Sequence, residues 1–142
     1  MFVLEAEYDP GTDEKPGTLL QSAQIVKGWV DAEGKAHEKV FQVAGDADSG
    51  ASVDTETCEQ AGPGEQQLCA VWRDPDFDPA QQAFYYARVL ENPSCRWSTW
   101  ECNALSADSR PEGCADPNIK KTVQERAWSS AIWYAPMVPV LN

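Results

Sequence analysis

Residues 22–31 (SAQIVKGWVD), residues 32–34 (AEG) and residues 38–44 (EKVFQVA) decide the fold. The first segment carries apolar side chains on both faces, which is typical of a strand in a sheet covered on both sides. Gly34 can adopt a positive φ, so residues 32–34 form a tight turn. In the last segment apolar and polar residues alternate, as they do in a strand with one buried face. The sequence therefore predicts a β-hairpin here.

Four more segments have strand composition, and no segment shows a sustained apolar period of about 3.6 residues. Apolar, aromatic and β-branched residues concentrate in these segments and turn residues such as Gly, Pro and Asp separate them. The four are residues 2–8, 67–73, 83–91 and 126–134. The predicted fold is mostly β: an immunoglobulin-like β-sandwich of about six strands. A single domain is expected over residues 1–142.

Residues 92–125 show no clear element. A structureless segment of that length is unusual in a compact domain, and such segments are normally functional or braced from outside. Three of the five cysteines lie within it. We therefore expect a long loop that is braced by disulfides.

The cysteines stand at positions 58, 69, 95, 102 and 114. They form no close pair of the kind that structural zinc sites use. Their spacing suits disulfides that close short loops, namely Cys58–Cys69 and one pair among the other three, of which Cys95–Cys102 is preferred. The fifth cysteine is then free or paired outside this segment. Disulfides indicate a periplasmic or extracellular location.

The net charge of −12 disfavours two classes of partner. Nucleic-acid binding draws on Lys and Arg, and here 23 acidic residues face 11 basic ones. Anionic membranes are disfavoured for the same reason, and no apolar run approaches the roughly 18 residues of a membrane span. The first residues lack the basic and apolar regions of a signal peptide. The oligomeric state stays open.

The sequence does not indicate a complete catalytic site. Its one histidine, His37, lies beside the predicted hairpin turn and is best explained as a satisfied surface residue. There is no glycine-rich phosphate loop. We therefore assign no catalytic residue and no cofactor to this chain, apart from calcium as discussed next.

Two acidic clusters have some of the features of a calcium site. The first has alternating oxygen ligands, then a glycine, then further carboxylates, although it lacks the usual fifth and twelfth ligands. In the second, carboxylates two residues apart point the same way on an extended segment. The alternative for the first cluster is an ordinary polar loop. The alternative for the second is that Asp78 caps a turn while Asp74 pairs with an arginine. The candidate ligands are Asp46, Asp48 and Asp54, and Asp74, Asp76 and Asp78.

The tryptophans divide into two groups. Trp72, Trp128 and Trp133 fall within predicted strands and are expected in the core. Trp97 and Trp100 lie in the long loop, between two cysteines. An aromatic loop of this kind can stack on sugar rings, cover an apolar patch of a neighbouring domain, or pack locally.

Five motifs, in order, resemble the C-terminal part of the domain-of-unknown-function family 3604. They are residues 24–29 (QIVKGW), 70–79 (AVWRDPDFDP), 83–91 (AFYYARVLE), 96–99 (RWST) and 124–134 (QERAWSSAIWY). The resemblance spans residues 21–134. It departs from the family at Ala131, where a proline is expected, and the cysteines at 95 and 102 are not shared by every member.

The resemblance implies a partner for this chain. Members of the family are several times longer, and their N-terminal portion resembles metal-dependent hydrolases of the polymerase-and-histidinol-phosphatase superfamily. The chain then resembles an excised C-terminal accessory domain that packs on a hydrolase-like domain upstream in the same polypeptide. The expected contact face consists of Arg96, Trp97, Gln124, Glu125 and Arg126. Alternatives are a carbohydrate- or ligand-binding module that uses Trp97 and Trp100, a structural or adhesive domain, and an autonomous enzyme.

Overall fold

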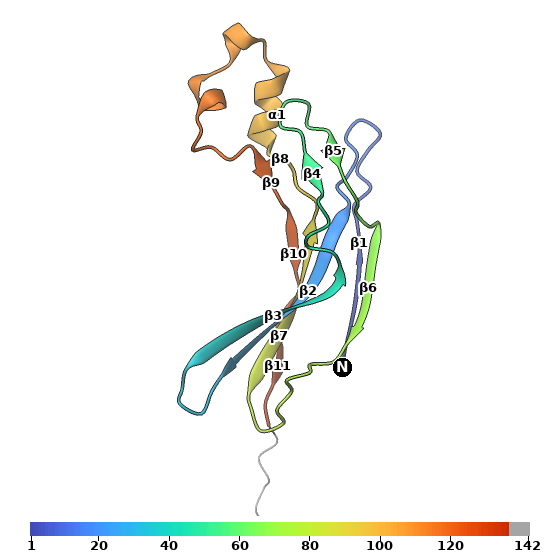
Figure 1. Cartoon of the computed structure of the whole chain (residues 1–142), viewed down its shortest axis with the longest axis vertical. Coiled ribbons are helices and arrows are strands. Elements are labelled where there is room, and N and C mark those ends of the chain that lie inside the picture. The colour runs from blue at the N-terminus through green and yellow to red at the C-terminus, as the bar shows by residue number, and fades with distance from the viewer. Residues whose placement is uncertain (137–142) are drawn as a thin grey trace, which may run out of the picture.

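The computed structural model describes residues 1–136 and consists mainly of antiparallel strands (Figure 1). The strands are β1 (Phe2–Glu7), β2 (Leu20–Val30), β3 (Ala36–Gly45), β4 (Ser52–Val53), β5 (Gln60–Ala61), β6 (Gln67–Trp72), β7 (Ala83–Glu91), β8 (Ser94–Cys95), β9 (Thr122–Val123), β10 (Arg126–Trp128) and β11 (Ile132–Tyr134). The helices are α1 (Trp97–Ala104) and the 3-10 turns η1 (Ala107–Ser109) and η2 (Glu112–Ala115). The predicted mostly β class is confirmed.

The largest layer is a five-stranded antiparallel sheet in the order β10-β7-β2-β3, with β11 also paired to β7. The predicted hairpin is formed by β2 in the middle of the sheet and β3 at its edge, with Ile25 opposite Phe41. The turn is closed by the hydrogen bond from the Asp31 amide to the carbonyl of Lys35, 3.0 Å long. Gly34 has φ +81°, as the turn requires.

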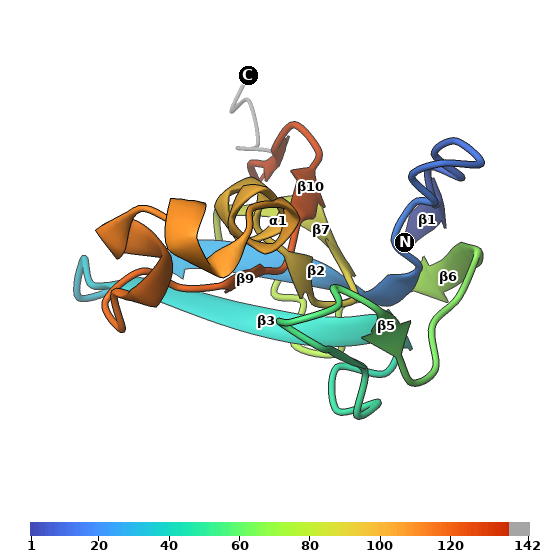
Figure 2. The same ribbon diagram turned by 90° about the horizontal axis from the view of Figure 1, so that it is seen from above.

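The second layer is a two-stranded ribbon of β1 and β6, which contacts β2 and β3. Figure 2 shows the ribbon standing to one side of β2 and β3. Apolar side chains from both layers form the core between them. One buried cluster joins Leu4 and Leu68 of the ribbon to β2, and a second joins Phe2 and Trp72 to β2 and β7. The layered arrangement is thus a sandwich with one small layer.

Residues 92–125 are not the structureless loop that we expected. Strands β8 and β9 pair to form a short stem, which carries α1, η1 and η2 at the top of the molecule in Figure 1. Only Thr99 is buried in α1, and neither 3-10 turn buries a residue. A helix that buries so little has no apolar period for a sequence to reveal. We call residues 96–121 the helical insert.

None of the helices among residues 1–136 has the length and apolar character needed to cross a membrane.

Candidate interaction surfaces

The disulfides differ from those expected. The bonds are Cys58–Cys95 and Cys102–Cys114, while Cys69 is free and exposed. Cys69 lies on the exposed side of β6, next to the buried Leu68, whereas Cys58 is buried and bonded to Cys95. The pairing Cys58–Cys69 is therefore wrong. Cys95–Cys102 is also wrong, because Cys95 is the last residue of β8 and faces Cys58, whereas Cys102 faces η2 from within α1.

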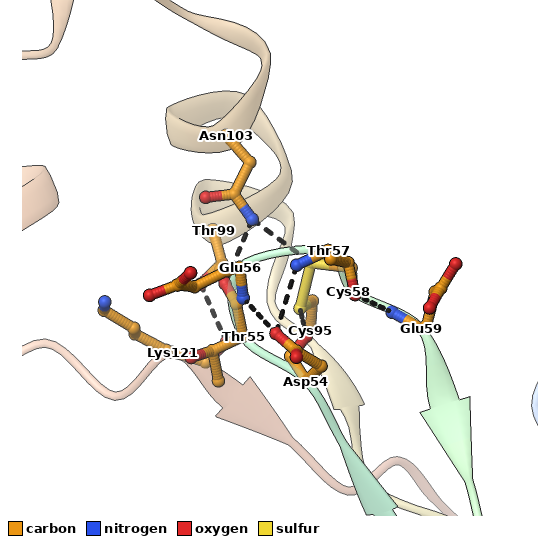
Figure 3. The surroundings of a disulfide bond; sticks show 10 residues. All are labelled: Asp54, Thr55, Glu56, Thr57, Cys58, Glu59, Cys95, Thr99, Asn103 and Lys121. Atoms are coloured by element: carbon orange, nitrogen blue, oxygen red, sulfur yellow. Dashed lines mark hydrogen bonds between the residues drawn. A yellow bond between two sulfur atoms is a disulfide. The ribbon is translucent and has the colours of Figure 1, made fainter. Parts of the chain in front are cut away.

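The Cys58–Cys95 bond joins the turn between β4 and β5 to the base of the helical insert (Figure 3). The side-chain amide of Asn103 on α1 donates to the carbonyl of Thr55 at 3.0 Å and lies 3.5 Å from Cys58 Sγ. On the other side of the insert, the Thr99 hydroxyl donates to the carbonyl of Lys121 at 2.7 Å. The helix is therefore held to two neighbouring segments, although it buries little apolar surface.

The helical insert lines an open hollow of about 560 Å³. It lies among α1, both 3-10 turns and the irregular segment that leads into β9, and the Cys102–Cys114 bond joins two of these walls. Trp97 is part of the wall and is 70% exposed. A smaller hollow of about 250 Å³ lies between β1 and β7, with mostly apolar walls.

The three candidate calcium ligands of the first cluster are dispersed. Asp46 Oδ1 accepts a hydrogen bond from the Asp48 amide at 2.9 Å, and the Asp48 side chain is exposed. Asp54 instead closes the turn that holds Cys58, where its Oδ1 accepts from the amides of Glu56 at 2.7 Å and Thr57 at 3.2 Å. These two hydrogen bonds, that from Glu56 first, hold the pKa of Asp54 below its ordinary value.

The carboxylates of the second cluster each have a separate partner. Asp74 Oδ2 lies 2.6 Å from Lys27 Nζ, and both side chains are only 3% exposed. Asp76 pairs with Lys39 at the surface. Asp78 accepts from the Ala80 amide at 2.8 Å and so closes its own turn. The expected partner of Asp74 was an arginine, and the structure provides a lysine from β2.

The Lys27–Asp74 pair is extended by further contacts. Lys27 also donates to the Asp76 carbonyl at 2.8 Å, and the Tyr85 hydroxyl donates to Asp74 at 2.7 Å. Burial disfavours the ionised carboxyl, but the hydrogen bonds from Lys27, Tyr85 and the Asp76 amide outweigh it, so the pKa of Asp74 is lowered. Burial, together with the nearby Asp74, raises the pKa of Tyr85. The loop after β6 is thereby fixed to the sheet.

Among residues 1–136 no three His, Cys, Asp or Glu side chains are placed so that they could hold a metal ion. The structure therefore does not bring the six candidate ligands together. Calcium binding by either cluster stays a prediction, and its test is given in the Discussion.

The five residues of the expected contact face lie around the β8–β9 stem. The Arg96 amide donates to the Lys121 carbonyl across the stem, and Glu125 and Arg126 lead into β10. Arg96, Trp97, Glu125 and Arg126 are exposed. Gln124 is half-buried and donates to Gln21 Oε1. The five side chains are thus in one region, and whether they touch a partner stays a prediction.

The environment of Glu91, beside this region, disfavours its ionised form. Burial, followed by the charges of Glu125 and Asp9, raises the pKa of Glu91 at the end of β7. Burial and like charges both oppose ionisation. The ionised form of Glu91 therefore destabilises the fold.

An aromatic surface lies on the side of the five-stranded sheet that faces away from the β1–β6 ribbon, which we call the outer face. Strand alternation places Phe84 and Tyr86 there, and pairing with β7 adds Trp128 and Trp133. The rings of Phe84 and Trp133 are 5.2 Å apart, and Phe84 and Tyr86 are stacked. Phe84, Tyr86 and Trp133 therefore form one aromatic cluster, and Trp128 lies on the same face, opposite Arg88.

Our expectation that Trp128 and Trp133 are core residues was wrong. Their side chains are 60% and 76% exposed, whereas Trp72 packs in the core as predicted. Gly28 fits the outer face because a Cβ there would lie 2.2 Å from Phe84 Cζ. Part of the signal for this surface was present in the sequence, since Phe84 and Tyr86 lie on one face of the strand and Tyr85 on the other. Which face is exposed depends on the side that the ribbon covers.

The single histidine has partners at the surface. His37 Nε2 lies 2.6 Å from Asp31 Oδ2, and its ring stacks on Trp29 at 5.3 Å. The hydrogen bond from His37, followed by that from the Lys35 amide, lowers the pKa of Asp31. The structure thus gives His37 a local role beside the hairpin turn.

Comparison with models of protein families gives one match. Residues 1–136 match the family described as "Protein of unknown function (DUF3604)". No curated protein and no solved structure matches this chain.

Proposed function

Because this chain belongs to the DUF3604 family, whose function is unknown, we propose a role for it from its surfaces: a non-catalytic accessory β domain. Its partner is a metal-dependent hydrolase-like domain upstream in the same polypeptide, as the family resemblance implies. The two disulfides support a periplasmic or extracellular location. The engagement of the only histidine with Asp31 and Trp29 supports a role other than catalysis.

The observation that carries this proposal is the aromatic outer face. Trp128 and Trp133 are more than half exposed, Trp133 packs against Phe84, and Trp128 lies on the same face of the sheet as Phe84 and Tyr86. Aromatic residues are enriched in the cores of protein interfaces, and large exposed apolar patches on soluble proteins commonly mark such interfaces. Arg126 lies on the same face as Trp128, two residues away on β10. The outer face therefore continues into the expected contact region at the stem.

Oxidative footprinting tests this proposal. Hydroxyl radicals should modify Trp128 and Trp133 readily in the 142-residue chain, and several-fold more slowly in the longer polypeptide in which the upstream domain is present. Phe77, which is 48% exposed in the loop after β6 and packs against Tyr134 away from the expected contact face, is the internal reference and should react similarly in both proteins. Equal modification of Trp128 and Trp133 in the two proteins would show that the outer face is not the contact surface. A native gene product without an upstream domain would refute the partner.

A further inference from the structure

We propose that the hollow of the helical insert is a binding site for a neutral saccharide. This site lies off the outer face, although Trp97 belongs both to its wall and to the expected contact face, so it is tested on the 142-residue chain without the upstream domain. Its walls come from residues 97–121, which leave the β8–β9 stem, turn outward and return to it (Figure 1). The volume of about 560 Å³ falls within the range of small-molecule sites in proteins.

The walls are held in place before any ligand arrives. The Cys102–Cys114 bond links α1 to η2, and both cysteines line the hollow. At the base, the Thr99 hydroxyl and Asn103 amide fix α1 to the carbonyls of Lys121 and Thr55, as Figure 3 shows. A site whose walls are already fixed loses less entropy when it binds. The disulfide and the two hydrogen bonds thus keep the walls of the site in place, although the helical insert buries few side chains.

The apolar part of the wall offers a face for stacking. Trp97 is 70% exposed although it lines the hollow, and Leu105 and Ile119 are 40% and 45% exposed. An indole combines a large apolar face with little conformational freedom. The face of a pyranose ring that carries only C–H groups matches such a surface.

The polar part of the wall is balanced in charge. It carries the cations of Arg110 and Lys121 and the carboxylates of Glu101 and Glu112. None of the four forms an ion pair within residues 1–136, where the three ion pairs lie elsewhere. Arg110 Nε donates to the Leu105 carbonyl at 3.3 Å, which orients the guanidinium at the hollow.

This combination selects the class of ligand. Free carboxylates accept hydrogen bonds and free cations donate them, so the wall can satisfy hydroxyl groups, which do both. The net charge of −12 repels anionic ligands, and a cationic ligand has many more acidic places to bind on the surface. A neutral molecule with many hydroxyls and one apolar face fits the wall best. A neutral oligosaccharide has these properties.

The test is a calorimetric titration of the 142-residue chain with a panel of neutral oligosaccharides. The panel contains tri- and tetrasaccharides of glucose, mannose, xylose and N-acetylglucosamine, with an oligogalacturonate as the anionic arm. We expect at least one neutral member to bind with a dissociation constant between about 1 μM and 1 mM. No binding by any neutral member up to about 10 mM, or tighter binding of the oligogalacturonate, would overturn the proposal.

Two matched variants test whether the saccharide binds in the hollow. Trp97→Ala should weaken binding at least about 10-fold, because exposed aromatic contacts commonly dominate binding. Trp100→Ala is the control, since Trp100 is on the same helix and exposed but does not line the hollow; it should change affinity less than about twofold. Equal effects of the two variants would place binding elsewhere. Circular dichroism confirms that both fold.

A second pair of variants tests the polar wall. Arg110→Gln should weaken binding, and Lys120→Gln should not, because Lys120 adjoins the wall without lining it. Loss of binding in Trp97→Ala with no change in Arg110→Gln would refute the assignment of the polar wall. A failure of these titrations leaves the footprint of Trp128 and Trp133 unaffected, so the two proposals can fail separately.

Discussion

Replacement of Lys27 by Met should destabilise the fold strongly. Lys27 Nζ and Asp74 Oδ2 are 2.6 Å apart, and both side chains are 3% exposed. The variant leaves the Asp74 carboxylate buried with only the Tyr85 hydroxyl and the Asp76 amide as partners. Removal of one member of a buried ion pair costs about 3–5 kcal/mol. For a chain of 142 residues this corresponds to a fall in melting temperature of roughly 10–20 °C.

Thermal and urea unfolding at pH 7 measure the effect, and two variants serve as controls. Lys39→Met removes a comparable pair with Asp76 whose side chains are 49% and 52% exposed, so it should cost less than about 1 kcal/mol. Lys27→Met combined with Asp74→Asn removes the unpaired charge, keeps an acceptor for Tyr85, and should recover most of the loss. A loss for Lys27→Met no larger than that for Lys39→Met would refute the reasoning.

The pH dependence gives an independent check. In the native protein the pKa of Asp74 is lowered, so its contribution to the free energy of unfolding is present above the unfolded pKa of about 3.9 and is lost as the pH falls through the folded pKa. In Lys27→Met the carboxyl has lost its cation, so its pKa rises and it becomes neutral earlier. The stability gap between the two proteins should therefore narrow as the pH is lowered from 7 towards about 4. A gap that widens would contradict the assignment.

Three further outcomes are expected. Alkylation of the native protein without reductant should modify Cys69 alone, and peptide mapping should find Cys58 joined to Cys95; a Cys58–Cys69 peptide would refute the structure here. Glu91→Gln should raise the melting temperature at pH 7 and lose this advantage in acid. The reason is that the folded pKa of Glu91 is raised, so the free energy of unfolding falls as the pH rises through that pKa. A lower melting temperature at pH 7 would contradict the repulsion from Glu125 and Asp9. EDTA tests the prediction of calcium binding: if either acidic cluster binds calcium, the chelator should lower the melting temperature by several degrees, and no shift at all would refute that prediction.

Most of the sheet could be predicted because its strands are recognisable from the residue types within each short segment. The β2–β3 hairpin follows from alternation and from a turn that contains Gly34, and both signals act over a few residues. Strand β7 was recognisable because aromatic and β-branched residues fill it. Residues 126–134, expected as one strand, form β10 and β11 with a break at Ser129, whose hydroxyl accepts from the Ala87 amide. Here a side-chain hydroxyl takes the place of a backbone carbonyl as the acceptor, and such a replacement does not change the pattern of apolar and polar residues that predicts a strand.

What could not be predicted depends on contacts between distant segments. Loop spacing favoured Cys58–Cys69, but the bond that forms joins residues 37 apart, because the β4–β5 turn and the end of β8 meet in space. The exposure of Trp128 and Trp133 likewise depends on the side of the sheet that the β1–β6 ribbon covers. The ribbon packs on one side of the large sheet, and the opposite face has no second layer within residues 1–136. Composition alone therefore placed these tryptophans in the core, where strands of this kind usually put them.

The positions of the disulfides bear on function. Neither bond links two strands of the five-stranded sheet or of the β1–β6 ribbon, whose core clusters are made of packed apolar residues. One bond joins the base of the helical insert to the neighbouring turn, and the other lies within the insert. In a chain-entropy model, loops closed by residues 37 and 12 apart stabilise the fold by about 4 and 3 kcal/mol. This stabilisation fixes the shape of a segment whose only buried helical residue is Thr99. A segment that adds little to the core, yet is cross-linked into one conformation, is best explained by a need for a defined surface, and the hollow beside Trp97 is the feature that this conformation creates.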